Sequence, residues 1–416
     1  MSYKSFELLN KLYFVRTGGS KEEFKAANIL KEECESLGIK AELESFKVDG
    51  CNIKKAELKF INPDFEVECA GVGMSSQTPE EGLVGEFVYI ENLADAEIKN
   101  VEGKICLLAT KLVNTKLYKK LVDKKAIGLI LCTGSVYDEN ENVDLDPYMY
   151  RERHYKNGKI PAVCIRMRDA EKILRAKPEK VHMTMLEDEL QNDSYNVVAT
   201  IEGSDKKDEV LVFTAHYDSV SYSKGAYDNA TGSTGIMQIL SYFKEHQPSR
   251  TLKFVWCGSE EMGLLGSKAY CEQHKEELEK YKLCINIDMI GVTIGFDIAC
   301  CTANNSLVNY VKYFGCEKGF AIQARQGVYS SDSTPFADAG VPALSFARIA
   351  PQGGAVIHSR KDVMDFLEEE NYYRSCDFIT AFAERMDSCV IIPVEREIPG
   401  NMKEEIDFYF GRKERD

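Results

Sequence analysis

The chain has 416 residues, of which 44% are apolar and 29% are charged, as in ordinary globular proteins. Its net charge of −15 argues against nucleic acid and anionic membranes as partners, because both attract basic surfaces. We expect no membrane-spanning segment and no signal peptide, since no long apolar run is present. The fourteen cysteines are scattered without a CxxC pair, which predicts reduced thiols and a cytoplasmic location.

Residues 20–38 carry the signals of a helix. Ser20 and Glu23 have the spacing of a capping box, and Gly38 is suited to follow the last turn. Phe24, Ala27, Leu30, Cys34 and Leu37 recur at helical spacing, which predicts one apolar face. An extended segment over 40–48 follows.

Residues 52–190 have a different texture, with short apolar runs separated by short helical patterns. We expect strands at 56–60, 85–90, 104–109, 126–132 and 160–165, and helices at 113–123 and 167–175. The charged, tyrosine-rich stretch 136–157 has no clear period, and a loop of that length is usually a binding lid or a mobile excursion. His154, within it, is a weaker candidate for substrate contact.

From residue 194 onward, strands alternate with helices. We expect strands at 209–216, 251–257, 283–291 and 341–348, and helices at 231–245, 266–280, 305–314 and 368–386. This alternation predicts an α/β fold with a mixed, largely parallel sheet that helices cover on both faces.

Acidic residues and histidines gather where these strands end. Ligands of an open α/β sheet collect at the carboxyl ends of its strands, so we expect these side chains to lie close together. They are His216, Asp218, Asp228, Glu260, Glu261, Asp288 and His358. Two imidazoles and three carboxylates suit two zinc ions that share one bridging carboxylate.

Glu260 and Glu261 follow the apolar run 251–257 directly, and two adjacent carboxylates at the end of a buried strand are costly without positive charge nearby. A pair of divalent cations removes that cost. One glutamate can then bind metal while its neighbour accepts a proton from water. Each motif alone also fits a strand end, a solvated helix surface or a helix start, but their conjunction favours a dinuclear site.

Six motifs occur in a characteristic order: "AHYDS", "GAYDNATG", "SEEMGLLGS", "NIDMIG", "SSDSTPFADAGVPALSF" and "IHSRKD". With this order and spacing, residues 195–390 resemble the co-catalytic dizinc aminopeptidases, a group similar to bacterial leucyl aminopeptidase and aminopeptidase Y and related to glutamate carboxypeptidase II. The resemblance implies that Asp228 bridges two zinc ions. It further implies that His216 and Asp288 complete one site, and that Glu261 and His358 complete the other.

The same resemblance implies roles for residues around the metals. Glu260 would be the general base, Asp218 would orient His216, and the peptide after Asp228 would be cis. Tyr329 is the nearest match to a tyrosine that helps to stabilise the oxyanion in the leucyl aminopeptidases. Arg348, which ends the run 341–348, fits either a substrate clamp or a structural ion pair, and the sequence leaves both open.

Residues 52–190 resemble the protease-associated domain that is inserted in this family, so the catalytic zinc-peptidase domain would be discontinuous, over 1–51 and 191–416. The resulting prediction is a metallo-exopeptidase, foremost an aminopeptidase acting on peptides. One alternative is a carboxypeptidase of the glutamate carboxypeptidase type, in which Arg348 and a basic patch at Arg151 and Arg153 would bind a substrate carboxylate. Another is a non-catalytic binding protein of the same fold.

Overall fold

The computed structural model describes residues 3–92, 95–110, 113–145 and 148–413. It divides into two compact units, the first formed by Met1–Val48 with Asp193–Asp416 and the second by Asp49–Asn192. Two strands of 21 and 22 residues, β1 (Ala41–Ile61) and β8 (Lys180–Ile201), contain residues of both units. The sequence predicted only separate short strands within β1, at 40–48 and 56–60.

The sheet of the first unit has the strand order β13–β12–β14–β11–β9–β10–β8. Its four central strands are parallel neighbours: β14 (Ala343–Ile349), β11 (Tyr281–Ile287), β9 (Lys206–His216) and β10 (Arg250–Cys257). The flanking strand β12 (Phe296–Thr302) runs antiparallel to β14 and pairs in parallel with β13 (Ile322–Gln326), while β8 runs antiparallel to β10. The sheet is therefore mixed and largely parallel, as predicted.

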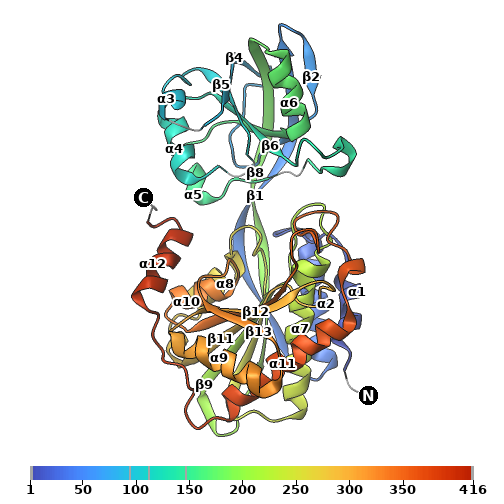
Figure 1. The fold of residues 1–416 in the computed structure, drawn as a ribbon, viewed down its shortest axis with the longest axis vertical. Helices are drawn as coiled ribbons and strands as arrows, with labels where there is room; N and C mark the ends of the chain where they lie inside the picture. Colours follow the sequence, from blue (N-terminus) through green and yellow to red (C-terminus); the bar gives the residue numbers. More distant parts are fainter. Residues whose placement is uncertain (1–2, 93–94, 111–112, 146–147, 414–416) are drawn as a thin grey trace. The chain divides into compact units, whose positions relative to one another are not determined.

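Helices lie on both sides of these strands (Figure 1). Alternate residues of β9 enter different cores, because successive side chains of a strand point to opposite faces. Leu211 and Phe213 pack in one core with the helices α1 (Ser5–Leu12), α2 (Lys21–Ser36), α7 (Thr231–Glu245), α9 (Asn305–Lys318) and α11 (Glu369–Ser388). Val210 and Val212 pack in the other with α8 (Leu265–Gln273), α10 (Ser333–Asp338) and α12 (Gly400–Tyr409). The predicted fold class is confirmed.

Helix α2 begins as predicted, but its buried face is shifted. The Ser20 hydroxyl accepts a hydrogen bond from the Glu23 amide at 3.0 Å, as in a capping box. Phe24, predicted to be in the core, is 43% exposed, whereas Glu23 is fully buried beside Ala26 and Ala27. The prediction for Phe24 was wrong because the Glu23 carboxylate finds hydrogen-bond donors inside the protein.

The second unit has its own parallel sheet, formed by β4 (Leu83–Ile90), β5 (Lys104–Leu108), β6 (Gly128–Thr133) and β7 (Ala162–Arg166). Part of β8 pairs with β4, β3 (Ala70–Gly71) pairs with β7, and β2 (Phe65–Val67) pairs with β1. The helices are α3 (Asp95–Ile98), α4 (Thr115–Asp123), α5 (Glu152–Tyr155) and α6 (Met167–Ala176). The resemblance of this unit to a protease-associated domain stays a prediction.

The stretch 136–157 contains a short 3-10 turn, Asn140–Asn142, and helix α5; its residues 146 and 147 lie outside the described ones. His154 is 1% exposed, and its Nε2 lies 2.9 Å from the carbonyl oxygen of Val113. This histidine therefore serves packing within the second unit. The structure contradicts its candidacy for substrate contact.

All fourteen cysteines are free thiols, and ten of them are buried. Burial raises the pKa of Cys106 and of Cys132 to about 12, so these thiols stay protonated and behave as small apolar side chains. Within the described residues, no helix has the length and apolar character needed to cross a membrane.

Candidate metal centre

The predicted site residues lie at one edge of the first sheet. His216 is the last residue of β9, and Asp288 directly follows β11. Glu260 and Glu261 follow β10 by a few residues, and His358 lies in the loop after β14. Because these four strands are parallel neighbours, their carboxyl ends bring these five side chains together.

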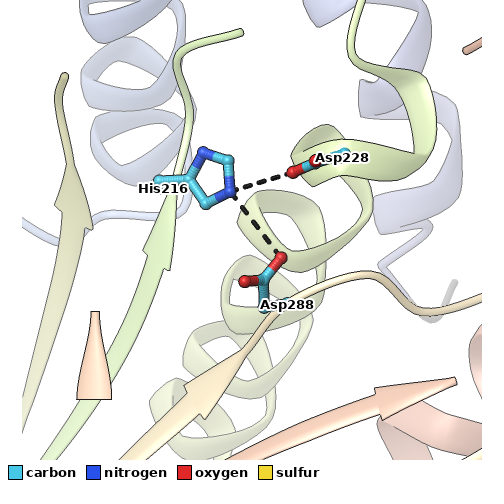
Figure 2. A group of neighbouring side chains, drawn as sticks. All are labelled: His216, Asp228 and Asp288. Carbon is cyan, nitrogen blue, oxygen red and sulfur yellow. Dashed lines mark ion pairs between the residues drawn. The ribbon is translucent and has the colours of Figure 1, made fainter. Parts of the chain in front are cut away.

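The inner ligand group consists of His216, Asp228 and Asp288, all of them buried. The Nε2 atom of His216 lies 3.1 Å from Asp228 Oδ1 and 3.6 Å from Asp288 Oδ1, and both carboxylates face the same ring nitrogen (Figure 2). Asp288 Oδ1 has no hydrogen-bond partner among the described residues. An unsatisfied buried carboxylate oxygen is costly, and a cation between these three side chains would satisfy it.

The outer ligand group consists of Asp228, Glu261 and His358. His358 Nε2 lies 3.1 Å from Asp228 Oδ2 and 3.1 Å from Glu261 Oε2, and the His358 side chain is 51% exposed. Asp228 therefore turns one carboxylate oxygen to each histidine. The two groups share this residue, which is the arrangement that a bridging carboxylate requires.

The carboxylates of both groups favour positive charge at the histidines. Burial lowers the pKa of His216, but the carboxylates of Glu260 and Asp218 outweigh that effect and hold the pKa well above its usual value. In the same way, Asp228 and Glu261 raise the pKa of His358 to about 11 against the effect of burial. Zinc binds neutral imidazole, and its charge would take the place of these protons. Two imidazole nitrogens and three carboxylates fit zinc in its usual donor set.

Asp218 connects the inner group to the glutamate pair. Its carboxylate accepts the backbone amides of Glu260 at 3.0 Å and Glu261 at 3.1 Å, and it lies 3.4 Å from Nδ1 of His216. Glu260 Oε2 lies 4.0 Å from His216 Nε2. Burial and the neighbouring Glu261, opposed by His216, hold the pKa of Glu260 well above its usual range. A carboxyl with a raised pKa is suited to accept and return a proton.

The turn that carries Asp228 is tied to β11. The Asp228–Asn229 peptide is cis, which confirms the prediction for this bond. The Asn229 side chain donates to the carbonyl of Ile287 at 2.9 Å and accepts from the amides of Gly232 at 2.9 Å and Met289 at 3.0 Å. One side chain thus fixes the spacing between Asp228, the start of α7 and the Asp288 strand.

Sequence reasoning missed Asp362, which supports the same turn. Its carboxylate accepts the backbone amides of Tyr227 at 2.7 Å and Asp228 at 3.0 Å, and it is buried. Burial raises its pKa to about 6. The only sequence signal is its place four residues after His358 in "IHSRKD".

Tyr329 and Arg348 differ in how far they fit the predicted roles. Burial and the carboxylates of Asp288 and Asp228 hold the pKa of Tyr329 well above its usual value, so its phenol keeps its proton near the centre. Arg348 donates to Asp297 Oδ2 at 2.8 Å and to the Val292 carbonyl at 2.8 Å, and is 7% exposed. The structure favours the structural ion pair over the substrate clamp for Arg348.

An α/β sheet with two overlapping groups of histidines and acids at its carboxyl edge is the arrangement expected of a metallohydrolase. Residues 196–383, which contain all five candidate ligands, match the model of peptidase family M28. This match confirms the resemblance read from the motifs.

Two relatives are similar in sequence to most of the chain. The chain is 25% identical to aminopeptidase YwaD of Bacillus subtilis over 395 residues, covering 91% of this chain and 83% of that protein. It is 28% identical to carboxypeptidase Q of Rattus norvegicus over 305 residues, covering 69% of this chain and 64% of that protein. The second match thus spans less than two thirds of the relative.

Among solved structures, BSAP, a zinc aminopeptidase from Bacillus subtilis, superposes with a TM-score of 0.78 at 20% identity over 95% of this chain and 98% of that one. An aminopeptidase from Aneurinibacillus sp. strain AM-1 superposes with a TM-score of 0.75 at 20% identity, over 95% of this chain and 96% of that one. At this level of identity the likeness establishes the fold.

Proposed function

We propose that the protein is a zinc aminopeptidase that removes N-terminal residues from peptides at a dinuclear centre. The observation that carries this proposal is the position of Asp228, whose two oxygens each lie 3.1 Å from a different histidine. His216 and Asp288 would hold one ion, and Glu261 and His358 the other. The match of residues 196–383 to the model of peptidase family M28 and the likeness to aminopeptidase YwaD support the exopeptidase assignment.

The chain's own residues would divide the work of hydrolysis. When bound, the zinc ions would polarise the scissile carbonyl and make water more acidic. Glu260 would take a proton from the attacking water and deliver it to the leaving amine. Asp218 would keep His216 in its binding orientation, and the protonated phenol of Tyr329 would donate to the developing oxyanion.

The contacts of Arg348 favour an aminopeptidase over a carboxypeptidase. Arg348, the predicted carboxylate clamp, is already bound to Asp297 at 2.8 Å, so it is not available to a C-terminal carboxylate. The likeness to carboxypeptidase Q keeps the carboxypeptidase as the second candidate. The complete ligand set argues against a non-catalytic binding protein.

The test is a panel of chromogenic aminoacyl anilides, assayed with and without a chelator. We expect turnover that the chelator abolishes and that added zinc restores. Peptides blocked at one end separate the two candidates: an aminopeptidase loses N-terminally acetylated substrates and keeps C-terminally amidated ones. The reverse preference would replace the aminopeptidase by the carboxypeptidase, and turnover that resists chelation would overturn the metal mechanism.

We also propose that the protein acts on peptides in the cytoplasm. Its fourteen free cysteines, ten of them buried, support a reducing compartment. The net charge of −15 supports the expectation that nucleic acid is not a partner.

A further inference from the structure

The segment 13–23 precedes the family-matched residues 196–383 by more than a hundred positions, yet it contacts both loops that carry the site. Arg16 is fully buried, and its amide donates to Ser219 Oγ at 3.1 Å. Its guanidinium donates to the carbonyls of Tyr217 and Gly225, the latter at 2.8 Å. These three partners belong to the loop between His216 and Asp228, so Arg16 fixes the connection between two candidate ligands.

Glu23 makes the corresponding contacts to the turn that carries the glutamate pair. Its Oε1 accepts the Ser259 amide at 2.7 Å and the Ser259 hydroxyl at 3.0 Å. Its Oε2 accepts the Gly19 amide at 2.7 Å. Ser259 immediately precedes Glu260, and its φ of +51° lies in the left-handed region that a residue with a side chain rarely adopts. The backbone before Glu260 is therefore strained, and Glu23 holds it in place.

The fit between the two segments is tight. A Cβ placed on Gly18 would lie 2.6 Å from both Ser259 Oγ and Met262 Sδ, so residue 18 packs directly against the 259–262 turn. Only a glycine allows this approach. The contact between Glu23 and Ser259 is thus part of a packed interface within the first unit.

Helix capping alone does not account for a buried carboxylate at position 23. Ser20 already accepts the amide of Glu23, which provides the helix start with its cap. Glu23 has no ion pair with a lysine or arginine in the part of the chain that the structure describes, and burial and Asp218 raise its pKa to about 8. A buried acid without a cationic partner destabilises a fold. The position of Glu23 beside the 259–262 turn therefore suggests a role other than stability.

We propose that Glu23 is a positioning residue for the 259–262 turn, which carries Glu260 and Glu261. Glu23 fixes Ser259 from one side, while Asp218 holds the amides of Glu260 and Glu261 from the other. This inference rests on the proposed function, since it assigns Glu260 as the base and Glu261 as a ligand. Glu23 touches neither substrate nor metal, and it acts only through the backbone of the residues that do.

Glu23→Gln is the test, and Glu22→Gln is its matched control. Glutamine keeps the size of the side chain, but its amide group would face the Gly19 amide donor, so one of the three hydrogen bonds is lost. Glu22 is the exposed neighbour on the same helix, and its substitution makes the same chemical change outside the buried contact. We expect Glu23→Gln to lower kcat by about tenfold to a hundredfold with KM changed less than about threefold. Glu22→Gln should leave both constants at wild-type values.

A second measurement does not depend on turnover. Zinc titration of the metal-free protein by calorimetry should give weaker binding for Glu23→Gln by about tenfold, because Glu261 shares the displaced turn. Ser259→Ala removes one of the two contacts to Glu23, and it is the variant to measure if Glu23→Gln does not fold. If both single variants fold, the double variant should lose less activity than the two single effects combined, because both substitutions break the same link.

The outcomes separate the positioning role from a purely structural one. A lowered melting temperature with wild-type kcat and zinc affinity per folded molecule would make Glu23 a stability residue and overturn the proposal. Additive effects of Glu23→Gln and Ser259→Ala on kcat would also overturn it. If the wild-type protein binds zinc but cleaves no anilide or peptide, the proposed function fails, while the titration still decides whether Glu23 organises the zinc-binding turn.

Discussion

The inner and outer ligand groups share Asp228 but differ in their exposure to solvent. Every member of the inner group is buried, and His216 is 1% exposed, whereas His358 of the outer group has 51% of its side chain exposed. A buried group of acids and imidazole needs its cation to remain folded at low cost, while an exposed ligand can exchange its cation with solvent. In the proposed centre, the inner position would thus be enclosed and the outer position open to solvent and substrate.

The largest loss of metal and activity should come from replacing Asp228, the residue that both ligand groups share. We expect Asp228→Asn to lose both zinc ions and to reduce turnover to background, because the amide offers only one oxygen and no charge. Metal analysis after desalting and the anilide assay measure the two effects. Asp208→Asn, at an exposed position on β9, is the control. A variant that keeps two ions would contradict the bridging role.

The next largest loss of activity should come from replacing Glu260, the proposed base, which belongs to neither ligand group. We expect Glu260→Gln to lower kcat by about a hundredfold to ten-thousandfold while both ions stay bound, because the amide cannot accept a proton from water. Steady-state kinetics and metal analysis on the same sample provide the measurement. Normal turnover in this variant would remove Glu260 from the mechanism.

Stepwise removal of zinc by a chelator should distinguish the two ligand groups directly. We expect a dilute chelator to remove the outer ion first and the inner ion much later, because His358 is open to solvent. Zinc content followed over time should fall in two phases, and His358→Ala should abolish the fast phase only. Loss of both ions in a single phase would mean that the groups do not differ in accessibility.

The smallest expected effect is a pH dependence of the melting temperature of the metal-free protein. Burial and Asp228 raise the pKa of Glu261 from its ordinary 4.5 to about 7 in the folded protein. This raised pKa stabilises the fold below pH 4.5, and that contribution is lost as the pH rises through 7. We expect the melting temperature of the metal-free protein to fall by about 5 °C between pH 5 and pH 8. Zinc-loaded protein should change little, since the ion holds Glu261 ionised. An equal slope in both forms would contradict this account.

The sequence was sufficient to predict the central sheet and the side chains that gather at its edge, because both follow from local patterns. Apolar runs bounded by turns predicted β9, β10, β11 and β14, and parallel strands bring the residues after them to one edge. The resemblance of the motifs to a known family then predicted which acid lies between the histidines. That pairing is the one the distances around Asp228 support.

Other features could not be read in this way. β12 runs antiparallel to β14, and the direction of a flanking strand depends on contacts far apart in sequence. Glu23 and Asp362 look like solvated surface acids in the sequence, because their donors, the amides of Ser259, Tyr227 and Asp228, are supplied only by the folded chain. Arg348 had two plausible roles until its partner Asp297, 51 residues away, was known.

Gly232 illustrates how far the constraint on this centre extends beyond its ligands. A methyl group there would lie 2.2 Å from the carbonyl oxygen of Ile287 and 2.3 Å from the side-chain oxygen of Asn229. Even alanine would therefore push the first turn of α7 off the sheet and pull the two carboxylates of the inner group apart. The geometry of the candidate centre thus depends on a residue that has no side chain and lies outside both ligand groups.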